Sequence, residues 1–273
     1  METIVTLTTD FGTEDAYVAA MKGTILGINP RATLVDISHS IEPQNIAQGA
    51  FVLSTAYSYF PDGTIHMVII DPEVGSQRRS IIVKTPKSIF VAPDNGVLSY
   101  ILYHASPIGY HPEAQPKGLP PGLLAFEITN PIFWRHPVSS TFHGRDIFAP
   151  VVAHISLGVP LEEFGKAISS INVFPIPQPQ VAESGDLIGH VLHIDRFGNI
   201  ITDIQRESIP LSKFRLEIAG QRIDSLSSAY DQANRLLALI DSSGYLEIAL
   251  KNSSAAHLLD VKIGDEVRIR KGH

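Results

Sequence analysis

The 273 residues are enough for one large domain, or for a large and a small one, and a content of 44% hydrophobic and 18% charged residues suits a globular protein with a sizeable core. The chain has no cysteine, which excludes disulfides, zinc–thiolate sites and a cysteine nucleophile. Its net charge of −7 argues against nucleic acid as the main partner. Its apolar runs fall short of the roughly 18–20 residues of a membrane helix, and its N-terminus does not resemble a signal peptide. We therefore expect a cytoplasmic protein.

Strands and helices alternate in the first part of the chain. In chain order, strands are expected at 3–9, 33–37 and 65–70, and helices at 17–28 and 46–60. This alternation predicts a mostly parallel, Rossmann-like sheet with right-handed crossovers, in which ligands bind beyond the carboxyl ends of the strands. Asp10 and Asp71 directly follow the first and third strands, and they are therefore candidate site residues.

The rest of the chain predicts a change of fold class. A loop rich in Pro, Gly and His is expected at 105–122, a helix bent by Pro150 at 144–157, and an extended segment with three alternate prolines at 172–184. Pairs of short strands around turns follow, at 187–194 with 199–204, 213–218 with 221–226, and 235–240 with 245–250. We therefore expect an N-terminal α/β domain (1–174), a linker (175–185) and a smaller C-terminal antiparallel, barrel-like β domain (186–273).

Several common signatures are missing from the sequence. It contains no G-x-G-x-x-G after a strand, no Walker loop, no G-x-S-x-G and no H-E-x-x-H. The histidines at 136 and 143, and those at 190 and 193, have no acidic partner at metal-ligand spacing. We therefore expect neither a metal nor a cofactor.

Four clusters place polar side chains beside glycine or proline at the ends of apolar elements. They are residues 8–12, residues 71–75 with Arg78, residues 140–146 and residues 195–199. A rigid scaffold presents functional side chains at such positions. Each cluster also has a purely structural interpretation: Asp10 and Asp71 as turn formers, Arg78 as a solvated charge, His143 as a helix-start residue, and the last cluster as a hairpin turn.

Taken together and in this order, the clusters resemble the S-adenosyl-L-methionine hydroxide adenosyltransferase family, whose relatives include fluorinases and chlorinases. The similarity extends over nearly the whole chain, through residues 7–12, 35–39, 93–96, 142–150 and 243–249. It implies an N-terminal α/β domain, a C-terminal β-barrel-like domain, and a homotrimer with active sites between subunits.

The resemblance also implies site residues. The family's water-activating groups are an Asp, an Arg seven residues later and a His in an F-H-G-R-D motif, which correspond here to Asp71, Arg78 and His143. The halogenating relatives lack this Asp and Arg. The substrate-binding residues that it implies are Asp10 for the ribose hydroxyls, Tyr17 near the methionine end, Asp195 for the methionine ammonium, Asn199 for the adenine edge with Phe197 nearby, and Asn95 and Ser243.

The implied activity is hydrolysis of S-adenosyl-L-methionine to adenosine and L-methionine by an activated water. Two alternatives remain at this point. One keeps the fold but uses a halide as the nucleophile, and Asp71 and Arg78 argue against it. The other is a non-catalytic protein that binds S-adenosyl-L-methionine or adenosine, and the intact set of water-activating residues argues against it.

Overall fold

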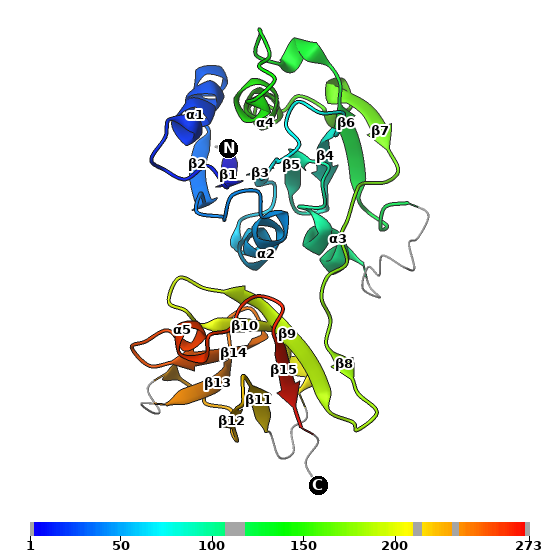
Figure 1. Cartoon of the computed structure of the whole chain (residues 1–273). Helices are drawn as coiled ribbons and strands as arrows, with labels where there is room; N and C mark the ends of the chain where they lie inside the picture. The colour runs from blue at the N-terminus through cyan, green and yellow to red at the C-terminus, as the bar shows by residue number, and fades with distance from the viewer. Residues whose placement is uncertain (1–2, 107–117, 210–214, 231–234, 271–273) are drawn as a thin grey trace. The chain divides into compact units, whose positions relative to one another are not determined.

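The chain forms two compact units, Met1–Ile176 (unit 1) and Pro177–His273 (unit 2) (Figure 1). The computed structural model describes residues 3–106, 118–209, 215–230 and 235–270. The expected α/β domain followed by an antiparallel, barrel-like β domain is confirmed. The expected linker at 175–185 falls on both sides of the division between the units, and its ends stay predictions.

Within the described residues, a seven-stranded sheet with the order β2-β1-β3-β5-β4-β6-β7 forms the centre of unit 1. Its strands are β1 (Ile4–Thr9), β2 (Thr33–Ser38), β3 (Ile65–Ile69), β4 (Ser80–Lys84), β5 (Ile89–Pro93), β6 (Leu124–Ile128) and β7 (Gly165–Ile168). The pairs β1–β2, β1–β3 and β3–β5 are parallel, whereas β4, β6 and β7 add antiparallel pairs. The carboxyl ends of β1, β2, β3 and β5 therefore share one edge of the sheet with the amino end of β4.

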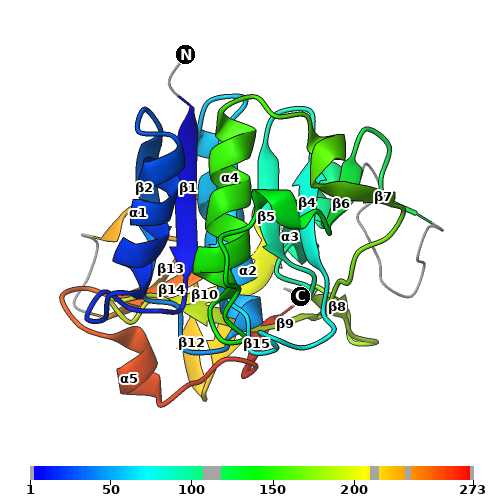
Figure 2. The ribbon, with the colours of Figure 1, turned by 90° about the horizontal axis from the view of Figure 1, so that it is seen from above.

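Helices cover both faces of this sheet (Figures 1 and 2). One face carries α1 (Tyr17–Ile28) and α4 (Ala149–Ser156), and the other carries α2 (Ile46–Ala56) and α3 (Ser99–Ala105). The core between the sheet and α4 includes Leu7, Met67 and Phe148, all of them fully buried. These apolar contacts hold the polar residues at the strand ends in place.

The helix expected at 144–157 begins differently from the expectation. A π-helical turn, η4 (Gly144–Phe148), precedes α4. Pro150 lies in the first turn of α4, directly after the π-helical turn. The expected bend at Pro150 stays a prediction, whereas the winding of the helix changes directly before the proline.

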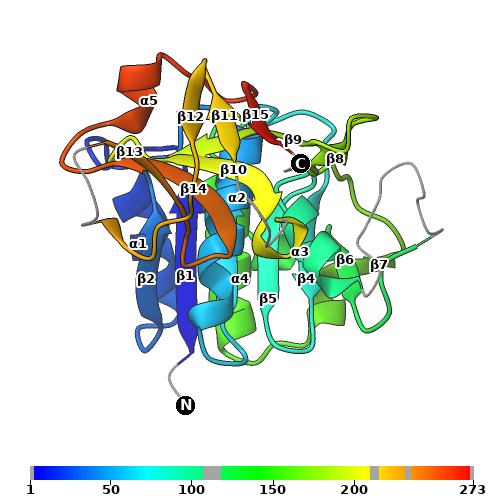
Figure 3. The ribbon, with the colours of Figure 1, turned by 90° about the horizontal axis from the view of Figure 1, so that it is seen from below.

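Unit 2 is an antiparallel sheet of short strands (Figure 3). Its elements are β8 (Gln180–Val181), β9 (Leu187–Ile194), β10 (Ile200–Gln205), β11 (Leu216–Ile218), β12 (Gln221–Ile223), β13 (Leu236–Ile240), β14 (Tyr245–Leu250), α5 (Ala255–Leu259) and β15 (Glu266–Ile269). An isolated bridge between Leu226 and Ala238 brings the two ends of the sheet together, so the sheet is nearly closed. The expected strand at 213–218 is described only from Arg215 onward.

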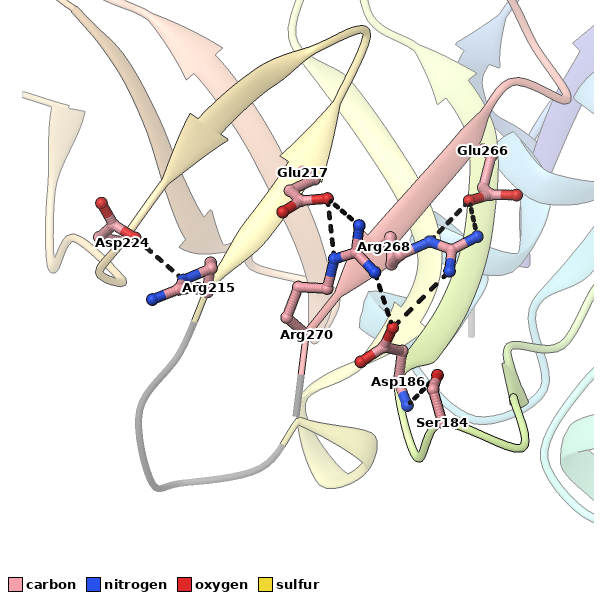
Figure 4. Close-up of polar contacts among 8 residues, drawn as sticks. All are labelled: Ser184, Asp186, Arg215, Glu217, Asp224, Glu266, Arg268 and Arg270. Carbon is pink, nitrogen blue, oxygen red and sulfur yellow. Dashed lines mark hydrogen bonds and ion pairs between the residues drawn. The ribbon is translucent and has the colours of Figure 1, made fainter. Parts of the chain in front are cut away.

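Ion pairs link three strands of unit 2 at its surface (Figure 4). Arg270 on the β15 side donates to Glu217 of β11 at 2.9 Å and to Asp186, just before β9, at 3.0 Å. Arg268 reaches Asp186 at 3.6 Å and Glu266 at 2.7 Å. Because the arginine side chains are 28–42% exposed, we expect these pairs to favour this strand arrangement more than they add to stability.

Part of the loop expected at 105–122 lies outside the described residues, which stop at Ser106 and resume at Gly118. Among the described helices, none has both the length and the apolar composition needed to cross a lipid bilayer.

One buried histidine makes the stability of unit 1 depend on pH. His66 on β3 is fully buried, its Nδ1 lies 2.8 Å from the hydroxyl of Thr6, and its ring stacks on Phe90 with centroids 4.9 Å apart. Burial lowers the pKa of His66 to about 4. The folded state therefore keeps this ring neutral at pH values where an unfolded chain protonates it.

Between about pH 6.5 and pH 4, His66 binds a proton in the unfolded state but not in the folded state. The free energy of unfolding should therefore fall as the pH falls. With about 1.4 kcal/mol per pKa unit, the loss is about 3 kcal/mol. Urea unfolding followed by Trp134, the only tryptophan and a residue of unit 1, measures it. His66→Leu should be less stable at pH 7 but should lose much less stability on acidification. Equal pH slopes in the two proteins would contradict this assignment.

Candidate active site

Three side chains from separate segments of unit 1 meet at the edge where the parallel strands end. Asp71 follows β3, Arg78 precedes β4, and His143 directly precedes η4. Arg78 Nε donates to the two Asp71 carboxylate oxygens at 2.9 and 3.1 Å, and Arg78 Nη2 lies 2.9 Å from His143 Nδ1. The guanidinium therefore links the carboxylate and the imidazole in one hydrogen-bonded chain, which we call the site triad.

The Arg78 side chain is fixed on every side. Its Nη1 donates to Ser80 Oγ at 2.7 Å, and its guanidinium carbon lies 5.3 Å from the centre of the Phe148 ring. The side chains of Asp71 and Arg78 are each only 5% exposed. A buried arginine and carboxylate with good geometry compensate for each other's lost hydration, and the fork of the guanidinium fixes their orientation.

His143 is held in its neutral form. Burial lowers the pKa of His143, the positive charge of Arg78 lowers it further, and Asp71 and Asp146 oppose the shift only in part. Since Arg78 donates to Nδ1, this nitrogen acts as an acceptor, and the proton of the neutral ring belongs on Nε2. His143 can therefore present one N–H donor to a ligand.

A buried carboxylate organises the segment that carries His143. Asp146 is fully buried, and it accepts hydrogen bonds from Ser139 N at 2.9 Å and from Arg145 Nε at 2.7 Å. Burial raises the pKa of Asp146, but the hydrogen bonds from Arg145 and Ser139 outweigh this effect, and the net pKa is lowered. The ionised carboxylate thus closes the chain between Ser139 and Asp146 into a fixed turn.

This turn touches the Asp71–Arg78 segment at a glycine. Gly75 has φ +81°, and a Cβ atom added there would lie 2.4 Å from the carbonyl oxygen of Ser140. The two backbones approach so closely that only glycine fits. The contact explains how residues 65 positions apart in the chain, Arg78 and His143, come within hydrogen-bond distance.

Asp10 and Tyr17 lie in the same unit. Asp10 follows β1, the neighbour of β3, and its Oδ2 accepts from Gln44 N at 2.7 Å. The exposed ring of Tyr17 packs against Phe11 and Phe142, with centroids 5.7 and 5.2 Å away. Phe142 is the residue before His143, so this aromatic group joins the start of α1 to the site triad.

Asn95 follows β5, and its carboxamide is bonded to the backbone. Its Nδ2 donates to Ile70 O at 2.8 Å, and its Oδ1 accepts from Val97 N at 3.2 Å. Ile70 immediately precedes Asp71. Asn95 therefore contacts the strand end that carries the carboxylate of the site triad.

Unit 2 contains a cavity of about 730 Å³ that includes three of the expected residues. It is lined by Asp195, Phe197, Asn199, Tyr230 and residues 250–254. Asp195 Oδ1 accepts from the backbone N of Phe197 and Asn199 at 2.8 and 2.9 Å, while its Oδ2 accepts from Asn199 Nδ2 at 3.0 Å. The turn after β9 is therefore a rigid frame from which the Phe197 ring, 77% exposed, projects.

Negative charge concentrates beside this cavity. Tyr230 donates from its hydroxyl to Glu247 at 2.9 Å. Burial raises the pKa of Glu247 to about 7, the charges of Asp195 and Asp241 also raise it, and the Tyr230 hydrogen bond counteracts them. Burial and the nearby carboxylates likewise raise the pKa of Tyr230 to about 12. These acidic groups make the cavity suited to a cation.

Sequence reasoning missed Tyr230 and Glu247. Glu247 had a detectable signal, because it is an acidic residue inside the apolar strand β14, but nothing in the sequence marks Tyr230. Ser243 lies exposed in the turn between β13 and β14, where its backbone N donates to Asp241 at 2.8 Å. Across the described ranges, no group of three or more acidic or histidine side chains is arranged to hold a metal ion.

Comparison with known proteins identifies two family models in this chain. The model described as the SAM hydroxide adenosyltransferase N-terminal domain matches residues 5–165, and the model of the C-terminal domain of the same family matches residues 189–268. Together they cover most of both units.

Relatives and solved structures match over nearly the full length. A protein of Methanocaldococcus jannaschii named (R)-S-adenosyl-L-methionine hydrolase is 37% identical, with 97% of this chain and 95% of the relative covered. A fluorinase of Actinopolyspora mzabensis is 29% identical over 98% and 97% of the two chains. The crystal structure of an uncharacterized conserved protein from Thermotoga maritima superposes with a TM-score of 0.85 at 35% identity, covering 98% of this chain and all of that one (100%).

The approach of Gly75 to Ser140 can be tested by substitution. Gly75→Ala should destabilise unit 1, because alanine is strained at positive φ by about 1–2 kcal/mol and its Cβ also displaces the Ser140 carbonyl. Gly63→Ala is the matched control, since Gly63 has φ +89° but nothing within 4 Å of an added Cβ. Urea unfolding followed by Trp134 should show the larger loss for Gly75→Ala. Equal losses would mean that the close approach does not constrain the segment.

Proposed function

Because both of its domains match the SAM hydroxide adenosyltransferase family, the chain belongs to this family, and we propose that it hydrolyses S-adenosyl-L-methionine to adenosine and L-methionine. Relatives named (R)-S-adenosyl-L-methionine hydrolase at 33–37% identity support this assignment. The single observation that carries it is the hydrogen-bonded site triad of Asp71, Arg78 and His143 at the sheet edge.

The chemistry of the substrate defines what the protein must supply. S-Adenosyl-L-methionine contains a sulfonium, so its ribose C5′ already bears a good leaving group. A water oxygen forms a bond to C5′, the C5′–S bond breaks with its electron pair going to sulfur, and methionine leaves as a neutral thioether. The water loses one proton. The missing element is therefore a positioned and partly deprotonated water.

In our proposal, Asp71 takes this proton. Arg78 occupies one side of the carboxylate, where Oδ2 accepts two of its hydrogen bonds, and Oδ1, which accepts one, retains a lone pair for a water. His143 is neutral, its Nδ1 accepts from Arg78, and its Nε2–H can hold the water oxygen in place. A positioned acid–base group accelerates proton transfer by about 10²–10⁴-fold.

Orientation and exclusion of water add to this effect. Holding the nucleophile in line with the C5′–S bond can supply a large part of the roughly 7–11 kcal/mol that well-oriented reactions gain. A hydroxide-like nucleophile attacking a cation destroys charge, so a dry site favours the transition state over separated, hydrated ions. The low exposure of Asp71 and Arg78, 5% each, fits this requirement.

The remaining expected residues, apart from Asn95, would bind the substrate. Asp10 is proposed to accept hydrogen bonds from the ribose hydroxyls, since its Oδ1 has no partner among the described residues while Oδ2 is bonded to Gln44 N. Tyr17 is proposed to lie near the methionine end. In unit 2, Asp195 would bind the methionine ammonium, and Asn199 the adenine edge with Phe197 beside it.

The turn between β13 and β14 contains no arginine that could bind the carboxylate of the methionine part. The halogenating relatives place an arginine at the position of Ser243, and this chain offers a serine hydroxyl instead. The homotrimer with active sites between subunits and the cytoplasmic location belong to the proposal as well. Light scattering after size-exclusion chromatography measures the subunit number directly.

Two substitutions separate water activation from binding. Asp71→Asn should keep the affinity for S-adenosyl-L-methionine in calorimetry but lower kcat by about 10²–10⁴-fold, because the proton acceptor is lost. Asp10→Ala should mainly weaken binding, since it removes only the proposed contact with the ribose. Production of adenosine at the wild-type rate by Asp71→Asn would rule out the proposed role of this carboxylate.

Isotope labelling identifies the nucleophile. In oxygen-18 water with chloride present, the product adenosine should carry one labelled oxygen, and chlorodeoxyadenosine should be absent, as judged by chromatography and mass spectrometry. Formation of chlorodeoxyadenosine would indicate the halogenase alternative. Binding of S-adenosyl-L-methionine without any release of methionine would indicate the non-catalytic alternative.

A further inference from the structure

Two neighbouring residues at the end of β5 hold both strand ends that carry the charged pair of the site triad. In the sheet, β5 lies between β3 and β4. On one side, Asn95 Nδ2 donates to Ile70 O at 2.8 Å, next to Asp71. On the other side, Arg79 Nε donates to Asp94 Oδ2 at 2.8 Å, next to Arg78.

The contact toward β4 is doubled and buried. Asp94 N also donates to Arg79 O at 3.0 Å, so the residue after Arg78 is bound by both its backbone and its side chain. The Asp94 side chain is 1% exposed, and its second oxygen accepts from Asn172 N at 2.7 Å. A carboxylate with this burial and this set of donors has one well-defined position.

The contact toward β3 is equally directional. Asn95 Oδ1 accepts from Val97 N at 3.2 Å, which turns the amide nitrogen of the side chain toward Ile70 O. The Ile70 carbonyl belongs to the peptide bond that leads directly into Asp71. A shift of Asn95 would therefore move the start of the segment that ends at Arg78.

We propose that Asp94 and Asn95, which we call the β5 clamp, are positioning residues that set the distance and orientation between Asp71 and Arg78. Asn95 acts on the reaction through Ile70 and Asp71, not by contact with the substrate. The expected effect on kcat rests on the proposed hydrolase function, whereas the expected effect on the geometry of Asp71 and Arg78 does not. Supporting residues of this kind typically change activity by about 10–100-fold when they are replaced.

Asn95→Asp is the most direct test, because it keeps the size of the side chain but places an oxygen against Ile70 O. Asn130→Asp is the matched control. Asn130 has the same pair of contacts, from Nδ2 to Glu163 O at 2.8 Å and from Ile132 N to Oδ1 at 3.2 Å, and it lies outside the site triad. Asp94→Asn provides a second variant that weakens the Arg79 contact.

We expect Asn95→Asp and Asp94→Asn to lower kcat for S-adenosyl-L-methionine hydrolysis by about 10–100-fold, with calorimetric affinity unchanged, while Asn130→Asp keeps the wild-type kcat. In the Asp71→Asn background, Asn95→Asp should lower kcat little further, because both changes act on the same function, the uptake of the proton by Asp71. Weakened affinity at unchanged kcat would overturn the proposal, since Asn95 would then contact the substrate. A lower unfolding free energy at unchanged kcat would also overturn it.

A measurement without substrate separates the clamp from the proposed function. The Nε–H proton resonance of Arg78, assigned by its loss in Arg78→Lys, reports the hydrogen bond to Asp71. It should shift in Asn95→Asp and Asp94→Asn and stay in place in Asn130→Asp. An unmoved resonance would overturn the clamp. Absence of turnover in the wild-type protein would overturn only the hydrolase assignment, because the spectrum still tests the geometry.

Discussion

The candidate site in unit 1 depends on where one guanidinium is held. Arg78 binds Asp71 through Nε and Nη2, His143 through Nη2 and Ser80 through Nη1, and it lies over the Phe148 ring. A lysine has neither the planar fork nor the number of fixed donors to make these contacts together. Because the pair is almost completely buried, removal of either partner leaves an uncompensated charge, so the surrounding segments are constrained to keep both in place.

Charge is distributed differently in the two units. In unit 1, the ionised pair Asp71–Arg78 sums to zero, and His143 is kept neutral by burial and by Arg78. In unit 2, Asp195 and Lys251 both line the cavity, and the charges of Asp195 and Asp241 act on Glu247, which is bonded to Tyr230 in the cavity wall. Under the proposed function, Asp195 in unit 2 would attract a cationic substrate, while the balanced pair in unit 1 permits low exposure without excess charge. Both properties suit a reaction in which a cation becomes a neutral thioether.

The sequence predicted the parts of the structure that arise from local patterns. The alternation of strands and helices placed Asp10 and Asp71 at carboxyl strand ends, and the hairpin pattern revealed unit 2. The meeting of Asp71, Arg78 and His143 came from family resemblance, since no periodicity shows that residues 65 positions apart touch. Tyr230 was missed for the same reason, because no local pattern shows its contact with Glu247, which is 17 positions away.

The antiparallel course of β4 is the feature that the helix–strand pattern could not supply, and the site depends on it. Arg78 immediately precedes the start of β4, and Ser80 of β4 pairs with Pro93 at the carboxyl end of β5. Had β4 run parallel to β5, Arg78 would lie at the opposite edge, about 15 Å or more from Asp71 for a five-residue strand. The segment between them has only to pass the end of β5, roughly 10 Å across two strand spacings, which seven residues span with slack for a turn. Because the segment from Asp71 to Arg78 is longer than the gap it crosses, its length alone does not fix the two side chains. In our proposal, Asp94 and Asn95 at the end of β5 fix them.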